Sequence, residues 1–181
     1  MEATAGNSPG NGAPPCLGGA PGDAGALVNR ERWDLTGRSR AYAELDHPAD
    51  IFIEVYGRDL PQLFENGLFA FYDQIAAIDG FDTAVKRTIS AKEATPADTF
   101  RALLSEALYK FESERFVAAV ATVQVNTLSG GQVEAIAHLG GEIADRERHV
   151  LCAEVKAITY HQLTVEQMPD GGWQATVLFD V

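Results

Sequence analysis

Acidic residues stand at both ends of the alternating apolar block of this chain. The stretch DHPAD, residues 46–50, comes directly before the run IFIEVYG, and Asp180 precedes the last residue, Val181. If the first and last strands are neighbours, Asp50, Asp180 and the α-carboxylate of Val181 converge, because the termini of a single domain often lie close together. Three carboxylates in one small volume repel each other unless they are protonated or bridged by a cation.

Oxygen-only ligands suit a hard divalent cation. We expect Ca²⁺, with Mg²⁺ or Mn²⁺ as alternatives, rather than zinc, which favours tetrahedral sets containing His and Cys. A simpler interpretation stays open at this point, since aspartates at strand ends commonly form caps and turns.

A second polar cluster lies in EVKAITYH, residues 154–161. Alternation along a strand places Glu154 and Lys156 on one face, either as an ion pair or as part of a binding surface. The alternative is an edge segment with solvated charges. His47 and His161 could serve as ligands or general bases, or as hydrogen-bonded structural groups.

The elements that must position these residues follow from the spacing of apolar residues. Helical spacing predicts helices over 59–78 and 97–114, which begin at the capping residues Asp59 and Thr95. Alternation with period two predicts strands over 41–45, 51–57, 84–93, 117–128, 132–140, 162–168 and 173–181. We therefore expect an α+β fold, a two-layer sandwich of one mostly antiparallel sheet against two main helices.

Composition predicts how the chain is divided. Residues 1–28 are mostly Gly, Ala and Pro and cannot bury enough apolar surface to become ordered, so we expect disorder there. Residues 1–40 are accordingly predicted to be tail and linker, and residues 41–181 the domain.

Charge and composition also restrict partners and location. The net charge of −12 disfavours strong nucleic-acid binding, which depends on Lys and Arg displacing counterions. No apolar run approaches the roughly 20 residues of a membrane span, and no secretory signal begins the chain. Two cysteines, Cys16 and Cys152, fit a reducing compartment better than a disulfide scaffold, so we expect the cytoplasm.

The motifs DHPAD, EVKAITYH and the terminal FDV, in this order, resemble those of the archease family. The resemblance covers essentially residues 41–181. It implies an accessory protein, not itself an enzyme, that activates the tRNA-splicing type of RNA ligase. In that family the accessory protein promotes guanylylation of the ligase, its multiple turnover and its wider use of nucleotides.

Residue by residue, the resemblance implies a metal site formed by Asp50, Asp180 and Val181. It makes Asp46 a turn residue or a support for the ligands, and His47 a residue that shapes the strand entry. Lys156 matches a lysine thought to matter for the encounter with the ligase, and Glu154 and His161 lie in the same segment. Pro48 replaces the usual threonine, which removes a hydroxyl and a backbone N–H donor near the metal.

Two other function classes stay open. One is a divalent-metal-dependent hydrolase in which Asp50 and Asp180 hold the metal and His47 or His161 acts as base. Against it, no nucleophile motif or phosphate-binding glycine loop accompanies the acids. The other is an interaction or chaperone-like module without metal, in which the acids are a solvated rim.

Overall fold

The computed structural model describes residues 33–181, and the disorder predicted for residues 1–28 lies outside them. The chain forms the following elements in order: η1 (Leu35–Gly37), α1 (Arg38–Ala41), β1 (Tyr42–Leu45), β2 (Ile51–Gly57), α2 (Leu60–Ile75), η2 (Ile78–Gly80), β3 (Val85–Glu93), α3 (Pro96–Glu114), β4 (Phe116–Thr127), β5 (Val133–Ile143), β6 (Ala157–Ile158), β7 (Thr164–Gln167) and β8 (Trp173–Asp180).

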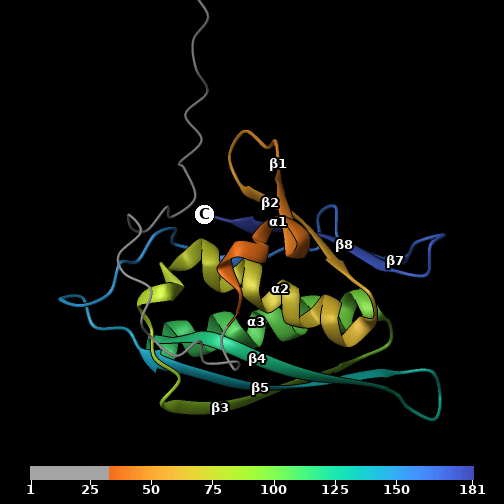
Figure 1. Cartoon of the computed structure of the whole chain (residues 1–181). Coiled ribbons are helices and arrows are strands. Elements are labelled where there is room, and N and C mark those ends of the chain that lie inside the picture. Colours follow the sequence, from red (N-terminus) through yellow and green to blue (C-terminus); the bar gives the residue numbers. More distant parts are fainter. Residues whose placement is uncertain (1–32) are drawn as a thin grey trace, which may run out of the picture.

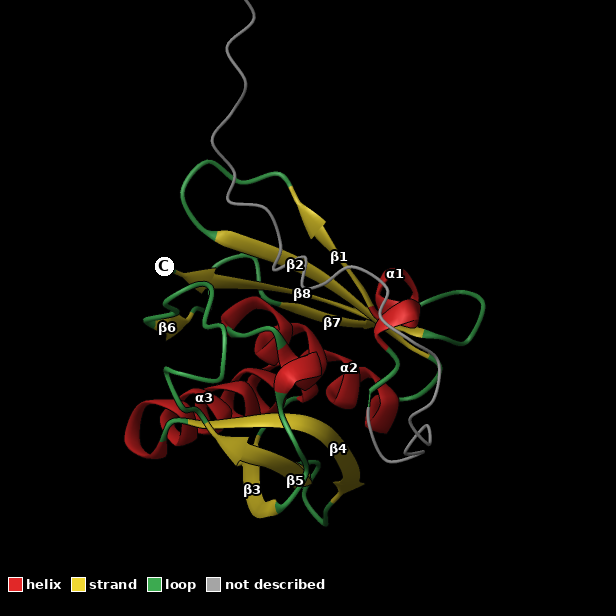
Figure 2. Ribbon diagram, turned by 60° about the vertical axis from the view of Figure 1, so that its left-hand side comes forward, coloured by secondary structure: helices red, strands yellow, loops and turns green. Residues whose placement is uncertain are grey.

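The strands form two antiparallel sheets with the helices α2 and α3 between them (Figures 1 and 2). The first sheet has the order β1-β2-β8-β6, and β7 also pairs with β8. The second sheet has the order β3-β5-β4. The first and last long strands, β2 and β8, are therefore neighbours, which is the condition on which the predicted site depends.

The predicted α+β class, its antiparallel strands and its two main helices are confirmed, but the strands do not form one sheet. The reason lies in α2, whose side chains are buried around most of its circumference, from Leu63 to Ile75. This helix contacts β2 of the first sheet and β4 of the second. A helix that is apolar on more than one side needs cover on more than one side, and three layers provide it.

Both main helices begin where their capping residues predict. The Asp59 carboxylate accepts a hydrogen bond from the Gln62 N–H at 2.9 Å, and the Thr95 hydroxyl accepts one from the Asp98 N–H at 3.1 Å. Each cap satisfies a backbone donor that the first helical turn leaves without a partner. At the far end of α3, Arg115 closes the helix in the left-handed conformation.

Residues 33–41, predicted to be mostly linker, pack against α2. The Trp33 ring stacks on Phe69 with the ring centroids 5.3 Å apart. The Arg38 guanidinium forms an ion pair with the buried Asp73, which also accepts a hydrogen bond from the Tyr42 hydroxyl. The predicted boundary at residue 41 therefore falls inside the packed part of the structure.

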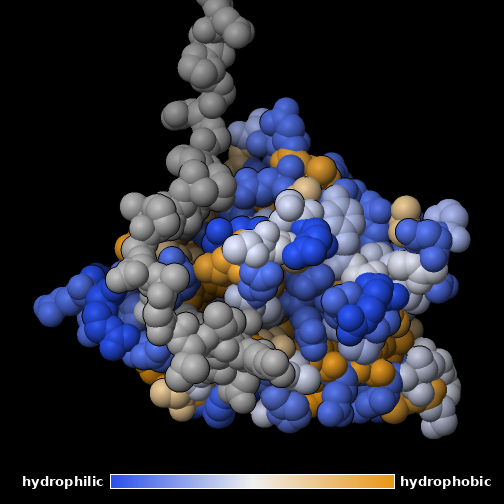
Figure 3. Space-filling model, in the orientation of Figure 1, coloured by the Kyte–Doolittle hydropathy of each residue, from blue (hydrophilic) through white to orange (hydrophobic). Residues whose placement is uncertain are grey.

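Hydrophilic side chains cover most of the described surface in the view of Figure 3. Within residues 33–181, no helix is long and apolar enough to cross a membrane. Cys152 lies in the described residues, just after β5 and its following loop, and its N–H donates to the Ile75 carbonyl at 2.9 Å. Cys16 lies outside the described residues, and the cytoplasmic location stays a prediction.

Candidate functional site

Pairing between β2 and β8 brings the two ends of the domain together. Ile51 pairs with Phe179, so Asp50, which directly precedes β2, and Asp180, the last residue of β8, lie at the same end of the two paired strands. Alternate residues of a strand share a face, so Asp50 follows Phe52 and Asp180 follows Leu178 onto the outer face of the first sheet. The two aspartates thus lie at one end of the first sheet, and continued alternation would put them on the same face.

The turn before β2 fixes the position of Asp50. The Asp50 N–H donates a hydrogen bond to His47 Nδ1 at 3.2 Å, and the Asp50 carboxylate lies 3.5 Å from the same nitrogen. The His47 ring also packs edge-on against Phe52, with the centroids 6.2 Å apart. Because Nδ1 accepts the backbone N–H, the neutral ring carries its proton on Nε2. His47 therefore fixes the backbone of Asp50 at the entry to β2.

Asp180 is held from its other side by the segment before β6. Ala157 pairs with Asp180, and the Lys156 N–H donates to the Asp180 carbonyl at 2.8 Å. The end of β8 consequently lies between the Asp50 turn and residues 156–158. The Asp180 and Lys156 side chains are both exposed.

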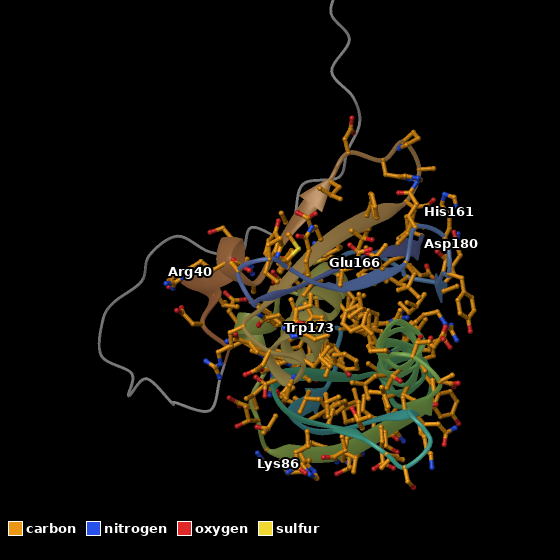
Figure 4. The ribbon with its side chains drawn as sticks, turned by 90° about the vertical axis from the view of Figure 1, so that its right-hand side faces the viewer. Arg40, Lys86, His161, Glu166, Trp173 and Asp180 are labelled. Atoms are coloured by element: carbon orange, nitrogen blue, oxygen red, sulfur yellow. The ribbon has the colours of Figure 1, made fainter. Side chains whose placement is uncertain are left out.

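The remaining predicted residues also lie on the surface. Glu154 and Asp46 are exposed, and His161 is exposed with its N–H bonded to Thr159 Oγ1 at 3.2 Å. Only Ala157 and Ile158 of the predicted alternating segment form a strand. Figure 4 shows His161 and Asp180 at the same end of the molecule.

Arg101 supports this segment and was not predicted. Its Nη1 donates to the Ile158 carbonyl at 3.3 Å, and its Cζ lies 4.0 Å from the centroid of the Tyr160 ring. Tyr160 is 65% exposed, so one face of its ring rests on Arg101 while much of the ring is open to solvent. No local signal in the sequence connects Arg101 in α3 with residues 158–160, because the contact depends on the packing of distant elements.

The oxygen donors at this end of the first sheet are of the kind that divalent cations bind. Asp50 and Asp180 offer carboxylate oxygens from adjacent strands, and the Val181 α-carboxylate follows directly. Within the described part of the chain, no three His, Cys, Asp or Glu side chains gather closely enough to hold a metal ion. Two side chains and one main-chain carboxylate suit a hard cation that keeps water among its ligands, as Ca²⁺ and Mg²⁺ do.

Comparison with known proteins shows the family of the chain but does not test the cation site. Residues 42–181 match the model of the Archease protein family. A protein named archease from Archaeoglobus fulgidus is 36% identical over 140 residues, covering 77% of this chain and 98% of the relative. One from Pyrococcus furiosus is 31% identical over 142 residues, covering 78% and 99%.

The fold is also similar to that of a solved structure. The solution structure of Methanobacterium thermoautotrophicum protein 1598 matches with a TM-score of 0.69, covering 78% of this chain and 99% of that one. The sequence identity is 23%, so this likeness concerns the fold alone.

Proposed function

Because this chain belongs to the archease family, we propose that it is an accessory protein in RNA processing that activates an RNA-splicing ligase. In this proposal the protein promotes guanylylation of the ligase and its multiple turnover, and has no joining activity of its own. The family match carries the proposal, since it spans nearly the whole described domain. The arrangement of Asp50 and Asp180 on one outer face supports it.

We propose that Asp50, Asp180 and the Val181 carboxylate hold a divalent cation, Ca²⁺ before Mg²⁺ or Mn²⁺. A bound cation would supply positive charge to phosphate oxygens of the nucleotide on the ligase. The protein residues orient that charge: His47 fixes the Asp50 backbone, and the Lys156 N–H fixes the end of β8. The exposed Lys156 ammonium adds a second positive charge at the same end.

Ordering charge before the reaction lowers its barrier, because the charges need not reorganise as the transition state forms. Arg101 also helps to fix this end of the molecule, because it contacts Ile158 and Tyr160 next to β8. Glu154 and His161 lie in the same exposed segment and are proposed to contact the partner or to support the ligands.

The test is a joining assay with the partner ligase, using RNA ends that carry a 2′,3′-cyclic phosphate and a 5′-hydroxyl. We expect several products per ligase molecule with the protein present and about one without it, while the protein alone joins nothing. Lys156→Ala should weaken activation, and Lys92→Ala, an exposed lysine on the second sheet, should not.

Guanylylation of the ligase is measured in the same samples. Equal rates with and without the protein would refute the proposal. Turnover of phosphodiesters or phosphate esters by the protein alone would instead favour a hydrolase. Activation that persists without any divalent ion would favour a metal-free interaction module.

A further inference from the structure

The outer face of the second sheet carries positive and hydroxyl groups in an otherwise acidic protein. Figure 4 shows Lys86 on this face, across the molecule from Asp180. Register places Lys86, Gly140 and Val120 in one row across β3, β5 and β4. Thr88, His138 and Thr122 form the adjacent row, and their side chains are exposed. Among residues 33–181 no helix lies over this face, because α2 and α3 pack on the inner side of the sheet (Figures 1 and 2).

Two lysines of β3 share this face but have different surroundings. Lys92 stands directly opposite Glu134, whereas Lys86 stands opposite Gly140. Within residues 33–181, Lys86 forms no ion pair. Lys92 thus has a nearby acid that offsets its charge, and Lys86 has none in its row.

Gly140 makes room for the Lys86 ammonium above the sheet. A Cβ added at Gly140 would lie 3.0 Å from Lys86 Nζ and 2.9 Å from Val120 Cγ1. The Lys86 ammonium therefore extends over β5, the middle strand of the second sheet. It occupies space that the side chain of any residue other than glycine at position 140 would fill.

Hydrogen-bonding side chains lie in the row of the sheet next to that of Lys86. Thr88 Oγ1 lies 3.1 Å from His138 Nδ1, in the row next to Lys86. These groups line a groove of about 690 Å³ that also includes Thr122. Glu65 is the carboxylate among the lining residues, and one of its oxygens accepts the Val123 N–H at 3.0 Å.

We propose that this groove binds a phosphate group, with Lys86 Nζ as the cationic ligand and the Thr88, His138 and Thr122 side chains as hydrogen-bond partners. An ammonium without an acidic partner beside several hydrogen-bonding groups is suited to an oxyanion with several acceptor oxygens. The phosphate can come from an RNA chain or from a small free phosphate. The site goes beyond the proposed ligase activation, and its test needs no ligase.

The experiment is a titration of the full chain followed by amide NMR shifts, with two probes in separate arms. Inorganic phosphate is one probe, and a short unstructured single-stranded RNA is the other. We expect saturable shifts at Thr88, His138 and Gly140. Tighter saturation by RNA identifies RNA as the source, and saturation by inorganic phosphate alone identifies a free phosphate.

Variants separate this site from general charge attraction. Lys86→Gln should weaken binding by about tenfold, because it removes a charge-assisted hydrogen bond. Lys86→Arg should retain binding, and Gly140→Ala should weaken it by displacing the ammonium. Lys92→Gln, which removes the same charge from the same face, should leave binding unchanged.

Two results would overturn the proposal. One is the absence of shifts in this row with both probes. The other is equal weakening by Lys86→Gln and Lys92→Gln, which would mean that any lysine on the sheet acts alike.

Discussion

At the scale of single residues, the proposed cation site needs both of its aspartates, Asp50 and Asp180. We expect Ca²⁺ or Mg²⁺ binding to the intact chain in a calorimetric titration, and its loss in Asp50→Ala and in Asp180→Ala. Each substitution removes a carboxylate from a set that has few protein ligands to spare. Glu166→Gln is the control, because this exposed acid belongs to the same sheet but to β7. Unchanged binding in both aspartate variants would rule the site out.

The charged Glu65 carboxylate destabilises the folded state, and a neutral side chain at this position would not. Burial raises the pKa of this carboxyl, although the hydrogen bond from the Val123 N–H acts in the opposite direction. A carboxyl whose folded pKa is raised favours the folded state most when it is protonated, below the unfolded pKa of about 4.3. That contribution is lost as the pH rises through the folded pKa. We therefore expect Glu65→Gln to increase the free energy of unfolding at pH 7.

The pH dependence distinguishes this explanation from a general effect of the substitution. Denaturant unfolding at pH 7 should show the stabilisation, and unfolding near pH 3, where Glu65 is neutral, should show little difference from the parent chain. An equal difference at both pH values would contradict the role of burial. Gln retains an oxygen that can accept the Val123 N–H, so the hydrogen bond remains.

At the scale of elements, α2 and α3 approach closely at Gly67. A Cβ at this position would lie 2.3 Å from a carbon of the Phe100 ring, and both residues are buried. Gly67→Ala should lower the free energy of unfolding by about 1–3 kcal/mol, the usual cost of overpacking a filled core. Gly80→Ala is the matched control, because nothing lies within 4 Å of a Cβ added there. Urea unfolding of the two variants measures the difference.

Local signals in the sequence predicted the elements well, and their long-range arrangement less well. The caps at Asp59 and Thr95 set the helix starts because each acts on residues three positions away. The division into two sheets depends instead on how many sides of α2 are buried against strands. The spacing of apolar residues along the sequence does not show this. The segment 154–161 has the alternation of a strand, but only Ala157 and Ile158 pair with β8.

For the candidate site, too, the sequence predicted local features better than long-range contacts. The two aspartates could be selected from their positions at strand ends, and the pairing of β2 with β8 puts those ends together, while their role as ligands stays a prediction. Arg101 and Lys86 could not be predicted as site residues, because their surroundings come from strands and helices distant in the sequence.

At the scale of the whole molecule, the folded unit extends beyond the family match, which begins at residue 42. A chain beginning at residue 42 lacks Trp33 and Arg38, so Phe69 loses its stacking partner and the buried Asp73 loses its ion pair. We expect this chain to be less stable than one beginning at residue 33 by about 3–5 kcal/mol, since breaking a buried pair leaves a charge uncompensated. Denaturant unfolding of the two chains gives the comparison.

Two point variants of the longer chain test the cause. Arg38→Gln should reproduce much of the loss. Arg40→Gln should not, because Arg40 is exposed and lies 3.9 Å from the exposed Asp34. Equal stability of the two truncated chains would mean that residues 33–41 add nothing to the fold.

The central place of β8 in the first sheet has a consequence during synthesis on the ribosome. The second sheet comes from one continuous stretch, from β3 to β5, and can pair as it emerges. β2, in contrast, has β1 on one side and must wait for β8 on the other, although both helices and the whole second sheet are translated in between. Until then the edge of β2 that later pairs with β8 has no strand partner. Chains whose translation stops early therefore carry an open strand edge, and they are the form of this protein most prone to aggregate.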